Sequence, residues 1–398
     1  MTVDNVELQA TLSGEIYLKS PPVRRRFSQA VCSNAQQALA GGARVEELAP
    51  GRVRVGGVDD PAAAASRLQR VFGIRGIEEL IGFPFPDLET GVELAADLAA
   101  PMVRGERFAV RCKRVGSHPF RSSNVERQLG TLLLGESAGV DLTTPGVTVR
   151  LRVVDDQGWL TLRRWDGPGG LPIGVQGRAL VLLSGGYDSA VAAYRLMRRG
   201  VRCEFLHLQL ACDQRDQALA MSHHLWDRWG AGMEGVVHVV DFEGVRQEIV
   251  DRIHPRFRQV ALKRLMLQAA DRVADETGIE VLATGEAIGQ VSSQTFAHLT
   301  ALDSLATRSV LRPLLTADKE EIVTQARRIG VAELAERAGE ACDLADGHRV
   351  ETTVRADKVA RVADRVDDAA VAAALAEWRV HRLESWLPGS EGERRTAA

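Results

Sequence analysis

The sequence Ser-Gly-Gly-Tyr-Asp-Ser at residues 184–189 constrains the fold more than any other segment of this chain. It follows an apolar run at residues 179–183 and precedes a helical pattern that ends near Gly200, so it predicts a buried strand, a tight loop and a helix. Two glycines let the loop turn backbone N–H groups inward, and the hydroxyls of Ser184 and Ser189 add donors. Because the positive end of a helix dipole also favours an anion, the segment predicts a phosphate-binding loop.

Asp188 lies inside this loop and would repel a bare phosphate, so its presence predicts a bridging Mg²⁺ ion. The spacing differs from G-x-x-x-x-G-K-[ST], which excludes a Walker-type loop. The alternative interpretation is an ordinary strand-to-helix turn that binds nothing.

Composition excludes several classes of protein. No apolar run approaches the roughly 20 residues that span a bilayer, and the first residues show no secretory signal, so we expect a cytoplasmic protein without a membrane partner. A net charge of −3 means that any nucleic-acid surface must be a local patch. Five scattered cysteines without a C-x-x-C pair argue against a disulfide framework, a zinc site or an iron–sulfur cluster.

Signals along the chain predict two small α+β domains, at residues 1–80 and 81–166, with a linker at residues 83–87. The glycine-rich stretch 167–174 is the clearest boundary. Beyond it, strand-like runs alternate with helical patterns, which predicts an α/β domain with a parallel sheet over residues 175–390. We expect a helical pattern from Thr353 to Trp386 and a disordered polar tail at residues 391–398.

Further residues of the α/β domain could carry chemistry. The polar loop from Gly285 to Thr295 follows a predicted strand, so it should lie at the same sheet edge as the Ser184 loop. Lys319 and Lys263 are candidates for contacting phosphates, with Thr316 as a helix N-cap before Lys319. Both lysines could instead be ordinary surface residues.

Cys342 lies in a short polar stretch, where an exposed and partly ionised thiol could act on an activated carbon atom. Cys203 and Cys112 lie on predicted strands, which favours inward-facing side chains for both. The basic residues of the small domains are candidates for contacting an RNA backbone, whereas most of the aromatic residues among them are expected to fill the cores. The basic candidates are Arg24, Arg26, Lys113 and Arg114.

Several segments, in order along the chain, together resemble the tRNA 4-thiouridine synthetases, also called tRNA uracil 4-sulfurtransferases. The matching segments are residues 15–20, 23–27, 110–114, 155–156, 169–174, 183–189, 196–200, 262–264, 284–295, 311–314 and 318–320. The resemblance implies a ferredoxin-like domain, a THUMP domain that binds the tRNA acceptor end, and a catalytic domain of the PP-loop ATP pyrophosphatase type, which is adenine nucleotide alpha hydrolase-like. It implies that ATP and Mg²⁺ are used to adenylate O4 of uridine 8, and that a cysteine persulfide then supplies sulfur.

The resemblance also implies roles for individual residues. Asp188 would support adenylation and the Mg²⁺ bound to the phosphates, Lys319 would be needed for activity, and Cys342 would handle sulfur. The ATP site would be lined by Leu182, Leu183, Ser184, Gly185, Gly186, Ser189, Lys263, Gly285 and Gln294.

Longer members of the family carry a C-terminal rhodanese domain, which this sequence lacks. We therefore expect sulfur to come from a separate carrier, a cysteine desulfurase or a free-standing rhodanese, and a direct role in thiazole synthesis is doubtful. Archaeal relatives with an iron–sulfur cluster carry a C-x-x-C that is missing near Lys263, so no cluster is expected. A homodimer is expected from the resemblance alone.

Two other functions remain open at this stage. One is a different ATP pyrophosphatase, such as an amidating ligase, although no source of ammonia is evident. The other is a tRNA-binding protein of the THUMP type that has lost catalysis. Asp188, Lys319 and Cys342 are all present, which speaks against the second alternative.

Overall fold

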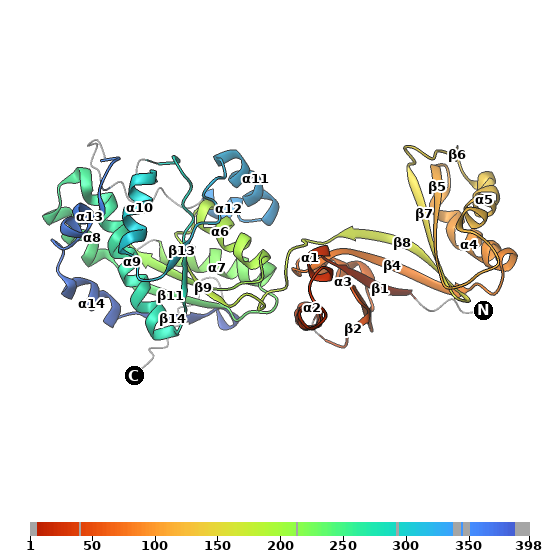
Figure 1. Ribbon diagram of the computed structural model, residues 1–398, viewed down its shortest axis with the longest axis horizontal. Coiled ribbons are helices and arrows are strands. Elements are labelled where there is room, and N and C mark those ends of the chain that lie inside the picture. The colour runs from red at the N-terminus through yellow and green to blue at the C-terminus, as the bar shows by residue number, and fades with distance from the viewer. Residues whose placement is uncertain are drawn as a thin grey trace. The chain divides into compact units, whose positions relative to one another are not determined.

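The computed structural model describes residues 6–39, 41–211, 214–291, 294–336, 344 and 351–386. The chain divides into two compact units, Met1–Gly169 and Gly170–Ala398 (Figure 1). The predicted sulfur-handling residue Cys342 and the predicted tail at 391–398 lie outside the described residues.

The N-terminal unit contains one eight-stranded sheet with the order β2-β3-β1-β4-β8-β7-β5-β6. Its strands are β1 (Val6–Leu12), β2 (Arg44–Ala49), β3 (Arg52–Gly56), β4 (Ile74–Pro84), β5 (Arg107–Val115), β6 (Gly139–Val140), β7 (Val147–Val154) and β8 (Gln157–Asp166). The long strands β4 and β8 pair antiparallel along most of their length and join the two halves of the sheet. Residue 80, the predicted end of the first domain, lies inside β4, so the bounds of the two small domains stay a prediction.

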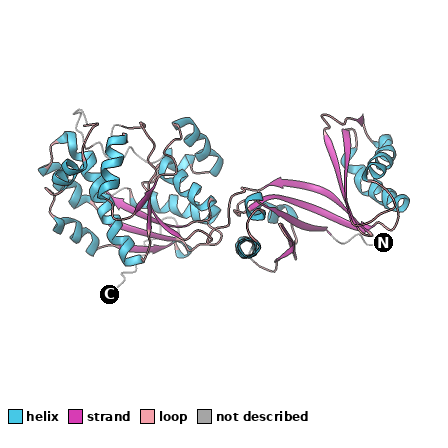
Figure 2. Cartoon of the chain, in the orientation of Figure 1, coloured by secondary structure: helices cyan, strands magenta, loops and turns pink. Residues whose placement is uncertain are grey.

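Helices cover one face of this sheet (Figure 2). They are α1 (Gly14–Tyr17), α2 (Pro21–Leu39), α3 (Pro61–Leu68), α4 (Leu88–Val103), α5 (Ser122–Leu133) and the short 3-10 helix η1 (Leu134–Glu136). Alternation along the strands turns apolar side chains toward the helices, so Val110, Leu151 and Leu160 are buried in one cluster with residues of α4 and α5. Asp87 caps α4 by accepting a hydrogen bond from the Thr90 backbone N–H.

The predicted linker at residues 83–87 is wrong. Strand β4 continues to Pro84, and Phe83 and Phe85 are only 4% and 1% exposed. The two phenylalanines pack into the core beneath α4, while Pro84 occupies the last position of its strand, where the missing N–H is tolerated. The two prolines are typical of a linker, but burial of the alternating phenylalanines holds this segment against the core.

The C-terminal unit contains a six-stranded sheet with the order β13-β12-β9-β10-β11-β14. Its strands are β9 (Arg178–Leu182), β10 (Arg202–Gln209), β11 (Val236–Asp241), β12 (Val281–Ala283), β13 (Ser309–Leu311) and β14 (Arg379–Arg382). All neighbouring pairs are parallel except β11 and β14. The sequence predicted helix through β14, which is wrong because the pairing of β14 with the edge strand β11 outweighs the local pattern.

Helices cover both faces of the parallel sheet, as expected for an α/β fold (Figure 1). They are α6 (Tyr187–Arg198), α7 (Arg215–Trp229), α8 (Glu243–Arg252), α9 (Pro255–Thr277), α10 (Phe296–Leu305), α11 (Lys319–Ile329), α12 (Ala332–Glu336), α13 (Ala356–Ala363), α14 (Asp368–Ala376) and η2 (Leu383–Ser385). Strand β9 lies between β10 and β12 in the sheet. The chain places β10 and β11 on one side of β9 and then β12 and β13 on the other, so the direction of strand addition reverses at β9. Ligands of such sheets bind beyond the carboxyl ends of the strands at this switch point.

None of the helices within the described residues has the length and apolar character needed to cross a membrane.

Candidate active site

The loop between β9 and α6 is held by its own hydrogen bonds. The Ser189 hydroxyl accepts from the Ser184 backbone N–H at 3.2 Å and lies 3.3 Å from the Gly186 carbonyl. Gly185 has a φ of +85°, which a side chain rarely tolerates. The Ser189 side chain is buried, so its hydroxyl shapes the loop, whereas Ser184 is exposed at the loop surface.

The first turn of α6 can receive an anion. Its N-cap residue is Gly186, which has no side chain to cap the helix, and the Ser184 hydroxyl accepts only a long 3.5 Å hydrogen bond from the Gly186 N–H. The N–H groups of the first turn therefore keep their capacity to donate, and the helix dipole adds partial positive charge. This arrangement fits a phosphate group, as the sequence predicted.

The second predicted loop touches the first. A Cβ atom added to Gly285 would lie 2.6 Å from the Asp188 carbonyl carbon and 2.6 Å from the Ser189 backbone nitrogen. Only glycine permits this approach, so the prediction that two loops converge beyond β9 and β12 is confirmed. Gln294 closes the second loop, because its backbone carbonyl accepts from the Gly289 N–H at 2.9 Å and its side chain lies 3.4 Å from the Ala287 nitrogen.

The Asp188 carboxylate lies at the centre of the site. Its two oxygens are 3.1 and 3.4 Å from Lys319 Nζ, and the Gln290 side-chain amide donates to one of them at 2.8 Å. The Asp188 side chain is 30% exposed, and that of Lys319 is 51% exposed. A partly exposed carboxylate beside an anion-binding helix end fits a divalent cation that also contacts phosphate.

Lys319 is the first residue of α11, a position where a cation opposes the helix dipole. The Asp188 carboxylate supplies the compensating negative charge. The predicted N-cap Thr316 is wrong, because Asp318 occupies that position and accepts from the Glu321 backbone N–H at 2.7 Å.

Arg195 of α6 fixes the position of α11. It donates to the Gln325 side chain at 2.8 Å and to the Pro313 carbonyl at 3.1 Å, and it forms an ion pair with Glu321. Lys319 is therefore carried on a helix that is tied to the helix of the phosphate loop.

Lys263 forms a second ion pair within the site region. Its Nζ lies 2.6 Å from a Glu286 oxygen, and the other Glu286 oxygen accepts from Arg312 at 2.9 Å and from Thr284 at 3.1 Å. Burial by itself would raise the pKa of Glu286, but Lys263 and Arg312 outweigh it and hold that pKa below its ordinary value. Lys263, predicted to contact ATP, is thus bound to a buried carboxylate.

Leu183 directly follows β9, and its backbone groups are bonded within the fold, since its N–H donates to the Leu206 carbonyl at 2.8 Å. Its side chain is 2% exposed, and its carbonyl oxygen lies 3.0 Å from His207 Nδ1. Because a carbonyl can only accept, Nδ1 carries the proton, and burial keeps the pKa of His207 below its ordinary value. Leu182 is partly buried and packs against the main core. The contact of the two leucines with ATP stays a prediction.

The basic residues predicted to meet RNA all lie in the N-terminal unit. Arg24 and Arg26 are on α2 and lie over the rings of Tyr17 and Phe27, at 5.6 and 5.3 Å from the centroids. Lys113 is exposed on β5.

The neighbouring Arg114 points the other way and packs 5.5 Å from the centre of the Phe120 ring. Cys112 is partly buried and packs against the core cluster of α4 and α5, and Cys203 is 1% exposed, so the prediction that both turn inward is confirmed.

The sequence missed three residues of the site: Glu286, Gln290 and Arg312. All three belong to polar segments that follow strands, which was the available signal. Their individual partners depend on contacts between segments far apart in the chain.

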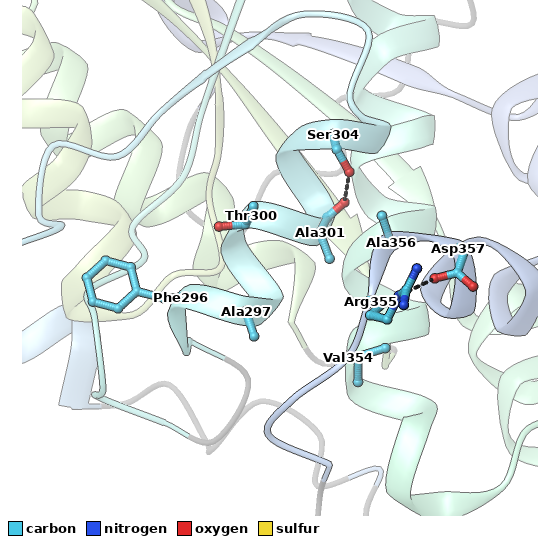
Figure 3. Close-up of a pocket in the computed structure, with 9 residues that line it drawn as sticks. All are labelled: Phe296, Ala297, Thr300, Ala301, Ser304, Val354, Arg355, Ala356 and Asp357. Carbon is cyan, nitrogen blue, oxygen red and sulfur yellow. Dashed lines mark hydrogen bonds and ion pairs between the residues drawn. The ribbon is translucent and has the colours of Figure 1, made fainter.

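A separate pocket of about 640 Å³ lies between the start of α10 and the start of α13 (Figure 3). Phe296, Thr300 and Ser304 line it from α10, and Val354 and Arg355 line it from the other side. It contains none of the predicted site residues.

Comparisons with protein families agree with the two-unit structure. The family model described as "Thiamine biosynthesis protein (ThiI)" matches residues 174–367, and the model for the THUMP domain matches residues 87–163.

Curated relatives match almost the whole chain. The tRNA sulfurtransferase of Desulfurococcus amylolyticus is 38% identical over 387 residues, which cover 95% of this chain and 79% of the relative. The tRNA sulfurtransferase of Marinobacter nauticus is 37% identical over 377 residues, covering 91% of this chain and 76% of the relative.

Among solved structures, a 4-thiouridine synthetase–RNA complex with bound ATP matches with a TM-score of 0.82 and 26% identity. The match covers 95% of this chain and 99% of that chain. A Pyrococcus horikoshii protein matches with a TM-score of 0.61 and 20% identity, over 82% of this chain and all of the other, and shows the shared fold alone.

Proposed function

The chain belongs to the tRNA sulfurtransferase family, and from this membership we propose that it adenylates O4 of uridine 8 in tRNA and replaces that oxygen with sulfur. The product would be 4-thiouridine. The activity at family level is ATP-dependent thiolation of tRNA, in line with the solved relative that holds RNA and ATP. The uracil position and the order of steps belong to the proposal.

The observation that carries the proposal is the contact between Asp188, Lys319 and the uncapped first turn of α6 at the switch point of the sheet. These groups could bind a nucleoside triphosphate, because the backbone N–H groups and Lys319 would hold its phosphate oxygens. Asp188 would hold Mg²⁺, which would neutralise phosphate charge during the reaction.

The chemistry requires activation because oxygen on C4 of uracil leaves poorly. When O4 attacks the α-phosphorus, pyrophosphate leaves and the N3 proton is lost, so the base carries an adenylate at C4. Sulfur then adds to C4 and AMP departs. The two-step route replaces one difficult displacement by two easier ones.

In the free protein Lys319 is already paired with Asp188. We propose that this pair opens when ATP and Mg²⁺ bind, so that Lys319 moves to phosphate and Asp188 to the cation. The pair is partly exposed, and exposed ion pairs contribute only about 0–1 kcal/mol, so the exchange costs little.

Cys342 would receive sulfur as a persulfide from a separate carrier, a cysteine desulfurase or a rhodanese-type protein. The outer sulfur would attack C4 and displace AMP, which leaves a C4–S–S–Cys342 linkage. A second thiol would then attack the Cys342 sulfur, so that 4-thiouridine leaves and a disulfide forms, and an external thiol reductant would restore Cys342. A cytoplasmic location and a homodimer are further parts of the proposal that rest on the family resemblance.

Mass spectrometry of nucleosides tests the function. Unmodified tRNA would be incubated with the protein, ATP, Mg²⁺, a cysteine desulfurase with cysteine as the source of persulfide sulfur, and a thiol reductant, while AMP is measured in parallel. We expect 4-thiouridine and AMP from wild type, neither from Asp188→Ala or Lys319→Ala, and AMP without 4-thiouridine from Cys342→Ser. The exposed Asp364→Ala on the same unit is the matched control and should behave as wild type.

Two results would contradict the proposal. AMP release that depends on an amine acceptor rather than on tRNA would favour an amidating ligase. Tight tRNA binding without any AMP would favour a THUMP protein without catalysis.

A further inference from the structure

Tyr187 joins the phosphate loop to Asp188, and the sequence alone gives it no role. It is the first residue of α6, directly after the N-cap Gly186. The shape of the loop does not depend on its side chain, because Gly185 supplies the positive φ and the Ser189 hydroxyl supplies internal hydrogen bonds. The ring and the hydroxyl of the tyrosine are therefore left for contacts with other parts of the unit.

The Tyr187 ring lies beside the ammonium group of Lys319. Lys319 Nζ is 5.6 Å from the centroid of the ring, within the distance of about 6 Å over which an aromatic face attracts a cation. The next residue, Asp188, holds the same Nζ at 3.1 Å through its carboxylate. Two consecutive residues of α6 thus hold one ammonium group, the first through a ring face and the second through a negative charge.

The hydroxyl of Tyr187 fixes the direction of the ring. It donates a hydrogen bond of 3.0 Å to Glu336, the last residue of α12. Helix α12 is in turn held by α7, because the Gln217 side chain donates to the Leu334 carbonyl at 3.1 Å. Burial raises the pKa of Tyr187 and the bond to Glu336 raises it further, so the hydroxyl keeps its proton and can donate.

The ring matters most for Lys319 when Asp188 is occupied elsewhere. Within the described residues, the contacts of the Lys319 ammonium group are those with Asp188 and Tyr187. In the exchange proposed above, the Asp188 carboxylate turns to the cation and leaves the lysine. The lysine stem is flexible and its side chain is 51% exposed, so without another contact it would adopt many directions. The neutral ring can stay beside the ammonium group, because it carries no charge that phosphate would displace.

We propose that Tyr187 is a positioning residue for adenylation: its ring keeps Lys319 beside the first turn of α6 while the lysine changes its partner from Asp188 to phosphate. This inference rests on the proposed function. Tyr187 takes no part in bond making and acts through the direction of Lys319. Loss of the ring should therefore slow the reaction of bound ATP more than it weakens the binding of ATP.

Steady-state kinetics of tRNA-dependent AMP formation test the role of the ring. Tyr187→Leu keeps an apolar side chain without an aromatic face, and we expect kcat to fall about 5-fold while KM for ATP stays within about 2-fold. Tyr187→Phe keeps the face and should hold kcat within about 2-fold of wild type. The matched control is Phe257→Leu, which removes a ring that lies 4.3 Å from Lys358 Nζ and should leave both constants unchanged.

The bond between Tyr187 and Glu336 can be tested separately. Tyr187→Phe and Glu336→Ala break the same hydrogen bond, so each should lower kcat by no more than about 2-fold. The double variant should be no slower than the slower single variant, because the second change removes nothing further. Losses that multiply in the double variant would contradict the anchoring of the ring by Glu336.

Nuclear magnetic resonance tests the contact without any turnover. The chain contains five lysines, so protein labelled with ¹³C at the lysine ε carbon gives few signals, and Lys319→Arg assigns the relevant one. Protons over an aromatic face are shielded. The Lys319 signal should therefore lie upfield in wild type and in Tyr187→Phe, and return to the position of a freely exposed lysine in Tyr187→Leu. The Lys358 signal, which Phe257 shields, should not change in these variants.

The same signal tests the ligand-bound state. With a non-hydrolysable ATP analogue and Mg²⁺ bound, the Lys319 signal of wild type should stay upfield, because the ring remains in contact after Asp188 has turned away. Loss of the upfield shift on binding would show that Lys319 leaves the ring together with the carboxylate, which would overturn the proposal.

Three further results would overturn it: a wild-type kcat for Tyr187→Leu, equal losses for Tyr187→Leu and Tyr187→Phe, or a Lys319 signal that the ring does not shift. Thermal unfolding close to wild type in each variant shows that a lower rate reflects a lost contact and not lost folding. A protein that forms AMP but no 4-thiouridine would refute the proposed function and leave this inference standing. Equal rates of 4-thiouridine formation by wild type and Tyr187→Leu would do the reverse.

Discussion

Two lysine–carboxylate pairs near the phosphate loop have similar chemistry and different surroundings. Lys263 and Glu286 are 2.6 Å apart and only 20% and 12% exposed. Lys319 and Asp188 are 3.1 Å apart and 51% and 30% exposed. The Glu286 carboxylate has further donors from Arg312 and Thr284, whereas Asp188 has one, from Gln290.

The difference indicates separate roles. Breaking a buried, fully bonded pair leaves an uncompensated charge, so Lys263 and Glu286 should keep the second loop in place throughout the reaction. An exposed pair can exchange partners at low cost, which suits residues that must receive a phosphate and a cation. We therefore propose that Lys263 supports the site and that Lys319 changes its partner when ligand binds.

The largest effect should come from removing the buried carboxylate. Glu286→Ala leaves Lys263 and Arg312 without their shared counterion and should lower the free energy of unfolding by about 3–5 kcal/mol. Asp188→Ala should stay within about 1 kcal/mol of wild type, because its pair is exposed. Urea unfolding of both variants measures the contrast, with the exposed Glu333→Ala as control. Similar decreases in the free energy of unfolding for Glu286→Ala and Asp188→Ala would show that the two pairs do not differ in their contribution to stability.

A smaller effect should follow from releasing Asp188 from its second partner. Gln290→Leu keeps the side-chain size but removes the amide that donates to Asp188, so the carboxylate should be less well oriented once Lys319 has left. We expect tRNA-dependent AMP formation to fall about 10-fold, with ATP affinity and stability close to wild type. An unchanged rate would show that Lys319 or the cation orients Asp188 without help.

The smallest effect should appear in the dependence of stability on pH. The pKa of Glu286 is lower in the folded protein than in the unfolded chain, so its ionised form stabilises the fold at pH values above the unfolded pKa, which is about 4.3. This contribution is lost as the pH falls through the folded pKa. The stability difference between wild type and Glu286→Gln, measured from pH 7 to pH 3, should therefore shrink toward acid. A constant difference would mean that ionisation of Glu286 contributes nothing.

Local patterns predicted the loop at residues 184–186, the helix after it and the strand at residues 281–283 with little error. Each of these depends on residues that are neighbours in the chain. The wrong predictions concern segments whose structure depends on strands far away in the sequence. Residues 83–87 have the composition of a linker, but β4 pairs with β8 as far as Pro84. Residues 379–382 have a helical pattern, but they form β14, which pairs with β11.

The sequence alone determined that a strand, a glycine loop and a helix follow one another at residues 178–198, because glycine placement and apolar periodicity act over a few residues. Only the tertiary structure decided which lysine faces which carboxylate. Lys319 and Asp188 are 131 residues apart in the chain, and Lys263 and Glu286 are 23 apart. Both lysines lie on helices, Lys263 on α9 and Lys319 on α11, so these pairs form only when the helices pack beside the segments that follow β9 and β12. The burial of each pair depends on the packing of the whole unit and determines how strongly its two charges interact.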